Sequence, residues 1–579
     1  MSGAGGHAYG SGAGGTGGAA TATASATSTT TGSDLVEGLA FATGAAGANN
    51  NNGNGGGGGA ANGASGTATS TSATGGHAYG YAHQLGGAGG AGFGAGHAGG
   101  AGGRATTTAA KASGYSAQAR VVQIGGAGGY GAGGANGGAG AASTVSNAVK
   151  GATAGGAASY LKLYQLATGG AGGGSSSGKG GVGGAASSNL TFNDVTANKT
   201  HAASVTGTAG AYGGAGGLSP GTGGRGGAAT ASLTLTGASN VSVTTDAIGG
   251  AGGIRAFGGN ASATSRAVGT ASITSNASAI GGTGGAGAGT ALAFAMGQGG
   301  SGSLNSTAST SLAHSLVTAV QSQAQAPVNG TGTAIAWAAI GNRADPSPVM
   351  VTDQAVALLT AEPTTTDVNN VLSNNANIKG AFTAAGTPIY FGIGELGGAY
   401  AYSSTDTASE TETSAVHMTV NLTKVSPLHD LIIGFYSGAA AGTGFTSMSL
   451  DVKINGADHI TNFATVADAN TYFQNKAVDY GALSALGTST LQLDISLTIT
   501  EAAAGGYDFG MLIGDPPAPS YPSPASGEGW GGGDAAAHHN LVAAMASFGV
   551  NGGDASGTLA PLSKDDQSVL AANRGNLHE

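Results

Sequence analysis

Apolar and polar residues alternate in several short segments of the first 340 residues. Ser232–Thr236 and Val241–Thr244 carry Leu or Val at every second position, and Ala271–Thr274 repeats the pattern more weakly. Because the side chains of a strand point alternately to its two faces, this period of two predicts strands with one buried face. Elsewhere the apolar member is often only alanine, so each predicted strand buries little area and depends on many neighbours for its stability.

A second group of apolar segments lies between residues 345 and 515. The predicted strands cover residues 418–423, 430–436, 448–454, 491–499 and 507–513. Turn signals such as Asn455-Gly456 separate them, which is typical of an antiparallel β-sandwich. One helix is expected to cross this sandwich over residues 466–476.

Gly-Gly-x-Gly-Gly islands interrupt the first region. They begin at Gly86, Gly125, Gly169, Gly213, Gly249 and Gly281, at spacings of 39, 44, 44, 36 and 32 residues. Repetition on this scale predicts an elongated array rather than a globular enzyme. Two ordered forms fit: a β-solenoid with glycine at its corners, or a bundle of polyglycine-like helices whose backbones touch. A disordered spacer is the third alternative, and Asn49–Gly59 is expected to be a loop or disordered.

Composition divides the chain into four parts. Residues 1–342 are the Gly-, Ala-, Ser- and Thr-rich repeat region, and residues 343–515 are the β-sandwich-like domain. Residues 516–533 form a Pro- and Gly-rich linker, and residues 534–579 a short helical tail. The predicted fold is therefore mainly β: a Gly-rich repeat array, β-solenoid-like or polyglycine-type, followed by an antiparallel β-sandwich and the helical tail.

Composition and charge exclude several classes of function. The chain has no cysteine, which excludes disulfides, thiol catalysis and thiolate metal sites. Residues 1–340 carry ten Lys or Arg and four acidic residues, a net charge of +6, and the remainder carries −16. The basic residues are scattered instead of clustered with aromatic residues, so no nucleic-acid binding is expected. No segment has the ~20 apolar residues of a membrane helix, so no transmembrane segment is expected.

Candidate chemistry is sparse. Gly173–Lys179 resembles a phosphate-binding loop, but Gly180 stands where Ser or Thr must hold Mg²⁺. Asp406, Glu410 and Glu412 cluster in a predicted Ser/Thr-rich loop. They are the candidates for a metal site, with calcium as the ion, and a solvated acidic loop is the alternative.

Histidine-containing pairs at residues 429–430, 458–459 and 538–539 could be fragments of acid–base or metal sites. None comes with a third partner that the sequence identifies. We therefore predict no catalytic residue, no cofactor-binding residue and no enzymatic activity. A carboxylate pair for glycosidic cleavage needs no local motif, so a carbohydrate-active enzyme stays open as an alternative.

The alternation of Ala/Thr/Ser segments with Gly-Gly-Ala-Gly-Gly, over roughly residues 1–330, resembles the Gly-rich repeats of large bacterial surface and extracellular-matrix proteins. Residues 345–515, which end in Tyr507–Asp515, are similar to a β-sandwich often found after such repeats. Leu541–Phe548 resembles the C-terminal ends of proteins exported by type I secretion, which carry an uncleaved export signal there. The resemblance implies a secreted or surface-bound bacterial protein.

Together these features predict a secreted structural or adhesive protein with a repeat stalk and a binding β domain, acting in cell adhesion or in a biofilm matrix. The basic stalk is expected to contact acidic polysaccharide or other cell-surface components, and self-association is compatible with an array. The alternatives are a carbohydrate-active enzyme or glycan-binding protein on a β scaffold, and a surface-layer or ice-facing flat repeat protein.

Overall fold

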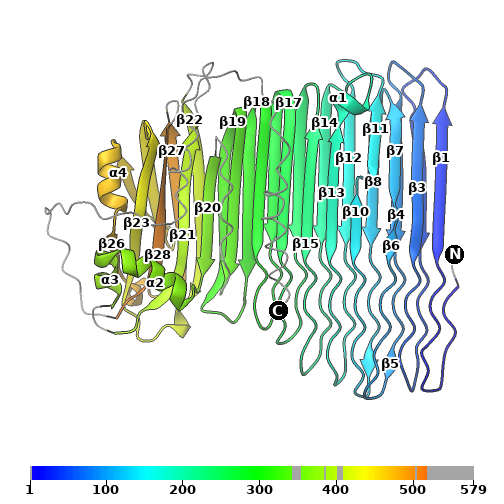
Figure 1. The fold of residues 1–579 in the computed structure, drawn as a ribbon, viewed down its shortest axis with the longest axis horizontal. Helices are drawn as coiled ribbons and strands as arrows, with labels where there is room; N and C mark the ends of the chain where they lie inside the picture. Colours follow the sequence, from blue (N-terminus) through cyan, green and yellow to red (C-terminus); the bar gives the residue numbers. More distant parts are fainter. Residues whose placement is uncertain (1–2, 342–353, 384–385, 401–408, 502–504, 518–579) are drawn as a thin grey trace.

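The computed structural model describes residues 3–341, 354–383, 386–400, 409–501 and 505–517. Within these residues the chain is mainly β, as predicted (Figure 1). There, 26 strands join in one large mixed sheet and two short strands, β5 (Gly92–Phe93) and β9 (Gly131–Ala132), form a separate pair. The predicted helical tail lies outside the described residues, as does the predicted linker beyond residue 517.

Two rows of parallel strands occupy residues 20–248, and the chain passes alternately through one row and the other. The first row contains β1 (Ala20–Ser28), β3 (Ala61–Ser70), β6 (Ala105–Thr106), β7 (Ala109–Gly114), β10 (Ser143–Ser146), β11 (Val149–Thr153), β13 (Ala186–Asn193) and β15 (Ala229–Thr236). The second row contains β2 (Leu35–Thr43), β4 (His77–Leu85), β8 (Ser116–Ile124), β12 (Tyr160–Thr168), β14 (Ser204–Tyr212) and β16 (Asn240–Ile248).

The register of the second row follows the spacing of the glycine islands. Leu85 pairs with Ile124 and Ile124 with Thr168, which are steps of 39 and 44 residues. The remaining steps, of 44, 36 and 32 residues, end at Ile280. The two series are equal because each island directly follows a strand that pairs in this row.

The two rows pack face to face over small and aliphatic side chains. Strand β3 lies against β2 and β4 without hydrogen-bonding to either. The alternation predicted for 232–236 is present in β15, where Leu233 and Leu235 are fully buried. Alanine takes the inward position in other strands, and Ala82 and Ala119 are buried as completely. The outward positions of each row are therefore the ones that vary without disturbing the interior.

The glycine islands continue below the strands as extended segments that run side by side (Figure 1). Gly86 and Gly89 donate hydrogen bonds to the next turn of the chain, whereas Gly87 and Gly90 donate across to a segment that leads into the first row. The donor pattern repeats every three residues, which is the period of a polyproline-II-type helix. The third position, Ala88, is exposed.

Contacts between backbones explain why these positions are glycine. A Cβ atom added to Gly87 would lie 1.9 Å from the carbonyl oxygen of Ala45, and one added to Gly86 would lie 1.9 Å from that of Gly103. The neighbouring carbonyl is itself fixed by hydrogen bonds, so neither site has room for a side chain. The exposed third position accepts one, which accounts for the Gly-Gly-x-Gly-Gly pattern. Gly55–Gly59 belong to such a segment, so the loop expected for 49–59 is wrong beyond the turn at 51–53.

Three long strands, β17 (Ala261–Ile280), β18 (Ala291–Ser311) and β19 (Val317–Ile340), span both rows. The first half of β17 pairs with β15 and its second half with β16, and β19 runs antiparallel to β18. Beyond β19, one row continues with β20 (Gln354–Ala361), β21 (Ile389–Tyr400), β28 (Gly505–Asp515), β23 (Asp430–Gly442) and β26 (Lys476–Ala482). The other continues with β22 (Glu410–Asn421), β27 (Thr490–Glu501), β24 (Ser447–Ile454) and β25 (Ala457–Phe463).

The helices of the described part are short: α1 (Asp194–Ala197), α2 (Thr365–Asn374), α3 (Ala376–Thr383) and α4 (Val466–Phe473), with 3-10 turns at Leu422–Lys424 and Leu483–Leu486. Helix α4 begins where predicted, because the Thr465 side chain accepts a hydrogen bond from the Asp468 N–H. It ends three residues earlier than predicted, since Asn475 has a φ of 54° and β26 follows at once. No described helix is long and apolar enough to cross a membrane.

Candidate functional site

The outward side of the second row carries a band of aromatic and basic side chains. Because alternate residues of these strands fill the interior, the intervening ones are left on the surface. We call this surface the aromatic face. It consists of Leu35, Leu39 and Phe41 of β2, His77, Tyr79, Tyr81 and His83 of β4, Gln118 and Arg120 of β8, Tyr160, Lys162, Tyr164 and Leu166 of β12, and Thr208 and Tyr212 of β14. Leu35 and Phe41 are each 59% exposed, which is unusual for large apolar side chains.

Parallel pairing brings side chains from distant segments into lines across the strands. One line runs through Leu39, Tyr81, Arg120, Tyr164 and Thr208. Neighbouring strands are about 4.8 Å apart, so each member of the line lies beside the next. The result is a basic side chain held between two tyrosines on an open, flat sheet.

Contacts between rings fix the geometry of this face. The rings of Phe41 and Tyr81 meet edge to face at 5.4 Å between centroids. Those of His77 and Tyr160 stack at 5.9 Å, although β8 lies between their strands. The intervening residue of β8 is Ser116, which is small and buried, so it leaves space for the stack. Such contacts contribute about 0.5–1.5 kcal/mol each and reduce the mobility of the rings.

Two cations lie among the tyrosines. The Arg120 guanidinium carbon is 5.7 Å from the centroid of the Tyr81 ring, and Lys162 Nζ is 4.7 Å from that of Tyr160. Within the described part of the chain, neither cation has a carboxylate oxygen within 4.0 Å. Their charge is therefore directed at solvent and at any ligand that covers the face.

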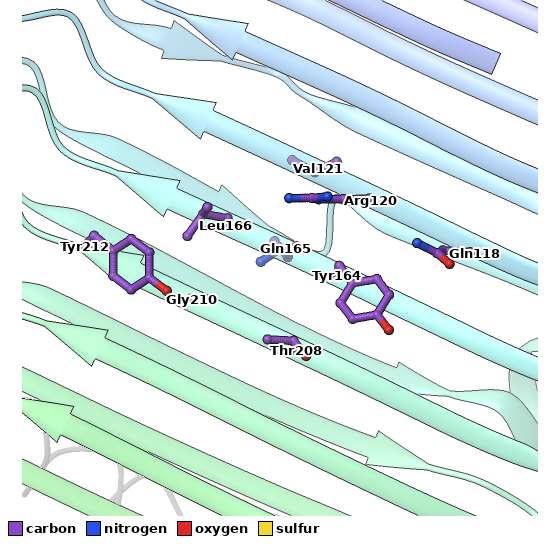
Figure 2. A pocket seen from close by; sticks show the side chains of 9 residues that line it. All are labelled: Gln118, Arg120, Val121, Tyr164, Gln165, Leu166, Thr208, Gly210 and Tyr212. Atoms are coloured by element: carbon purple, nitrogen blue, oxygen red, sulfur yellow. The ribbon is translucent and has the colours of Figure 1, made fainter. Parts of the chain in front are cut away.

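A shallow hollow of about 350 Å³ opens between β8, β12 and β14. Gly210 forms its floor because it has no side chain, and a Cβ there would lie 2.9 Å from Leu166 Cδ1. Figure 2 shows the rings of Tyr164 and Tyr212 on neighbouring strands, with Thr208 near them and Arg120 on the strand beyond Tyr164. A second hollow of about 270 Å³ is lined by Leu35, His77, Ala78, Tyr79, Gln118 and Tyr160. Gln118 lines both hollows, so they adjoin each other.

Burial sets the protonation states on this face. It raises the pKa of the phenols of Tyr79, Tyr164 and Tyr212, and the nearby Arg120 opposes that shift at the first two. The charge of Asp246, on the strand next to β14, raises the pKa of Tyr212 further. It lowers the pKa of His83, and Arg120 lowers that pKa further. At neutral pH these tyrosines therefore keep their hydroxyl protons, and His83 adds no positive charge beside Arg120.

The outward side of the first row, over the same turns of the chain, is chemically plain. We call it the hydroxyl face. It consists of Thr67 and Thr69 of β3, Lys111 of β7, Lys150 of β11, Ser187, Asn189 and Thr191 of β13, and Thr230, Ser232, Thr234 and Thr236 of β15. Its side chains are short apart from the two lysines, so it offers no ring against which a ligand could stack.

The predicted metal candidates are placed differently from the expectation. Glu410 and Glu412 lie in β22 and are buried, so their assignment to a loop is wrong, and Asp406 lies outside the described residues. Glu410 is paired directly with Glu501 of β27. Strand β22 begins before residue 418, where the apolar pattern placed its start, because polar residues such as Glu410 and Glu412 occupy its first inward positions. No group of three or more His, Asp and Glu residues that could hold a metal is found among the described residues, and calcium stays a prediction.

The histidine pairs read from the sequence acquire other partners. His429 Nδ1 lies 3.3 Å from the buried Asp515 instead of pairing with its neighbour Asp430. Burial raises the pKa of Asp515 and His429 opposes that shift. Asp458 pairs with Lys453 at 3.0 Å rather than with His459. The first contact joins the start of β23 to the end of β28, and the second joins β24 to β25. The pair at 538–539 lies outside the described residues.

One arrangement in the C-terminal rows has the order of a nucleophile, a base and an acid. His417 Nδ1 is 2.6 Å from Asp494, and its Nε2 is 3.2 Å from Thr419 Oγ1. Catalysis by such a trio needs N–H donors aimed at the developing oxyanion. Strand β22 is hydrogen-bonded to β19 on one side and β27 on the other, so its own N–H groups are used in the sheet. The geometry is that of a polar surface network.

The chain matches no protein-family model, and comparison with curated proteins finds no significant similarity.

Sequence reasoning missed the aromatic face. Its local signal is present in His77–Leu85 and Tyr160–Thr168, where aromatic residues alternate with small or aliphatic ones. His77 also belongs to Gly75–Gly80, which repeats Gly5–Gly10 letter for letter, so by sequence alone it indicates a duplication rather than a site. The signal becomes a site only when the register brings β4, β8 and β12 together, and composition does not provide that register.

Proposed function

We propose that this chain is a non-enzymatic structural protein of the bacterial cell exterior that attaches to polysaccharide through its aromatic face. The observation that carries the proposal is the line of Tyr81, Arg120 and Tyr164 on an open sheet. Half-buried rings at a surface offer apolar contact to the ring faces of sugars, and neighbouring hydroxyl, amide and basic groups offer hydrogen bonds. Adhesion or a biofilm matrix is the setting in which such a surface has a use.

The proposed stalk is residues 1–342, folded as a repeat array. We infer that β-solenoid-like strands and polyglycine-type segments occur together in each turn of this array, and that residues 343–515 form a β-sandwich stacked on its end. In support, hydrogen-bonded partners lie at the island spacings, and the glycine segments bond in two directions. Each turn adds about 4.8 Å of length, so the array extends the protein without enlarging its core.

The alternative is a carbohydrate-active enzyme. The His417 network has no oxyanion donor from its own strand, and the two hollows of the aromatic face are lined by tyrosine, basic and amide groups rather than by a pair of carboxylates. A binding role requires neither feature, which is why we favour it. The expectation that residues 343–515 carry the specific binding surface remains an alternative location.

The proposal is tested by retention of the full chain on insoluble polysaccharides, both neutral and acidic. We expect the wild-type chain to be retained on at least one of them. Changing Tyr81→Ala and Tyr164→Ala together should weaken binding about 100-fold, because two stacking anchors are lost. The matched control changes Thr230→Ala and Thr234→Ala on the hydroxyl face and should leave retention unaltered. Equal loss in both variants, or no retention of the wild type, contradicts the proposal.

Export through the C-terminal tail is a separate proposal, based on the resemblance of residues 541–548 to type I secretion signals. Deleting residues 534–579 should leave the protein inside the bacterial cell. The measurement is the ratio of the protein in the medium to the protein in the cells. An unchanged ratio after the deletion contradicts this route.

A further inference from the structure

We infer that the hollow over Gly210 is a carboxylate-binding subsite, so that the polysaccharide taken by the aromatic face is one built from uronic acids. The inference rests on the proposed attachment function and specifies its ligand. It is carried by the juxtaposition of Arg120 with the rings of Tyr164 and Tyr212 around a floor that has no side chain.

Arg120 is the group that selects an acid. Its guanidinium is exposed, and no carboxylate of the described residues lies within 4.0 Å of it. A planar guanidinium binds a carboxylate through two parallel N–H···O bonds, which an ammonium group does not match. The side chain lies near the ring of Tyr81 and near the phenol of Tyr79, whose pKa it lowers, and Arg120 is paired in register with Tyr164 on the other side.

The walls of the hollow suit a sugar ring beside that acid. Tyr164 and Tyr212 provide two rings whose phenols keep their protons, because burial raises the pKa of each. Thr208 provides a hydroxyl between them, and Gln118 provides an amide toward the second hollow. A hexuronate has an apolar ring face that suits the tyrosine rings, several hydroxyls that suit the Thr208 hydroxyl and the Gln118 amide, and one carboxylate that suits Arg120.

A second cation extends the site along a chain of such sugars. Lys162 is paired with Gln118 and is two residues before Tyr164 on β12. Strand geometry puts its Cα about 8 Å from that of Arg120. Lys162 Nζ is also held over the ring of Tyr160, beside the second hollow. A polymer with an acid on every sugar can therefore meet both cations at once, whereas a neutral polymer meets neither.

The charge of the surroundings agrees with an acidic ligand. Residues 1–340 carry a net charge of +6, and the acidic residues on this side of the second row are Glu37 of β2 and Asp246 of β16, which is paired with Gly210. Burial raises the pKa of Asp246, which favours its uncharged form, and β12 and β14 separate its strand from that of Arg120. An anionic polymer approaching β8 and β12 is thus attracted by Arg120 and Lys162 before it makes contact. The attraction must weaken as salt is added.

The experiment compares two forms of one polymer: polygalacturonate with free carboxylates, and the same polymer with its carboxyl groups methyl-esterified. Binding of the full chain to each is measured as a dissociation constant at two salt concentrations. We expect the free acid to bind about tenfold more tightly, since a charge-assisted pair is lost on esterification. The difference should shrink at the higher salt.

The decisive variant is Arg120→Gln, which keeps a polar side chain of similar shape at an exposed position. It should bind the free acid about tenfold more weakly, so that its affinities for the free acid and for the ester become similar. The matched control is Arg104→Gln, an exposed arginine just before the first-row strand β6, which should leave both affinities unchanged.

The outcomes separate the subsite from the broader function. If the wild type binds both forms equally, or if Arg120→Gln keeps the preference for the acid, the subsite is wrong while attachment through the tyrosines stands. If neither form nor any neutral polysaccharide is retained, the attachment function fails and the subsite fails with it. If Arg120→Gln loses both affinities and its circular dichroism spectrum shows that it is unfolded, Arg120→Lys is measured instead. If Arg120→Lys is folded and retains the full preference for the acid, the bidentate role of Arg120 is contradicted.

Discussion

The aromatic face and the hydroxyl face are built on the same turns of the chain and share one interior. Inward positions on both sides are small or aliphatic, such as Ala82 behind the aromatic face and Leu233 behind the hydroxyl face. The faces differ only in what the outward positions carry: tyrosine, histidine and arginine on one, serine and threonine on the other. The difference teaches that the inward side chains and the glycine segments determine the backbone arrangement, whereas the outward side chains of one row can change without altering it.

The largest effect is expected from a change that breaks the frame shared by both faces. In Gly214→Val, the new Cβ would lie 2.0 Å from the Gly170 carbonyl oxygen, so the segments must separate. We expect unfolding to become easier by about 3 kcal/mol or more. Ala215→Val changes the exposed neighbour and should stay within about 0.5 kcal/mol of the wild type. Chemical denaturation measures both, and equal stability of the two variants contradicts the packing described for the islands.

The next effect separates the two faces. Tyr212→Ala removes one wall of the hollow and should weaken polysaccharide binding about tenfold without changing the midpoint of unfolding. Thr236→Ala alters the hydroxyl face at the end of β15 and should change neither quantity. Titration calorimetry with the same polymer measures the affinities. A tenfold loss in Thr236→Ala would remove the distinction between the faces.

A smaller effect is expected when the hydroxyl face is given the chemistry of its counterpart. Thr191 and Thr234 are partners on neighbouring strands, as Arg120 and Tyr164 are on the aromatic face. Thr191→Arg and Thr234→Tyr are introduced together into the chain that carries Tyr81→Ala and Tyr164→Ala. The affinity for polysaccharide should rise about threefold above that of this parent variant, since one ring and one cation return. No gain in a folded variant would show that the pair alone does not make a binding surface.

The smallest effect is a change of pKa within the aromatic face. Burial, and secondarily Arg120, lower the pKa of His83 in the folded protein, so the unfolded chain takes up this proton first as the pH falls. The stability linked to His83 is therefore complete above about pH 6.5 and is lost as the pH falls below it. Arg120→Gln should raise the His83 pKa, as NMR titration of its ring protons can measure, and Arg104→Gln should not. An unshifted His83 in Arg120→Gln means that the two side chains are not neighbours.

Much of the frame could be predicted from the sequence. The alternation in 232–236 and 491–499 identified β15 and β27, and the island spacing equals the register of the second row. The choice between stacked strands and glycine segments could not be made, because each turn of the chain contains both. The start of β22 was missed since glutamates occupy its inward positions, where apolar residues were expected.

The site could not be predicted for a different reason. Tyr81, Arg120 and Tyr164 are separated by tens of residues, and only parallel pairing at the two steps of the register places them side by side. Each strand by itself shows only that aromatic or basic residues occupy its outward positions, as in β4 and β12, and not which residues lie beside them. Sequence reasoning that treats each strand separately therefore finds the fold and overlooks the surface that successive strands build together.

The central claim is that polysaccharide covers the aromatic face and no other, and hydroxyl-radical footprinting of the full chain tests it directly. With an acidic polysaccharide bound, the account predicts protection of Phe41, Tyr81 and Tyr164. Tyr130 of a glycine segment and Ile460 of β25, which are 49% and 59% exposed, should react as in the free protein. Protection confined to Ile460 and its neighbours, with the tyrosines of the aromatic face still reactive, would contradict the account and move the binding surface to the C-terminal rows.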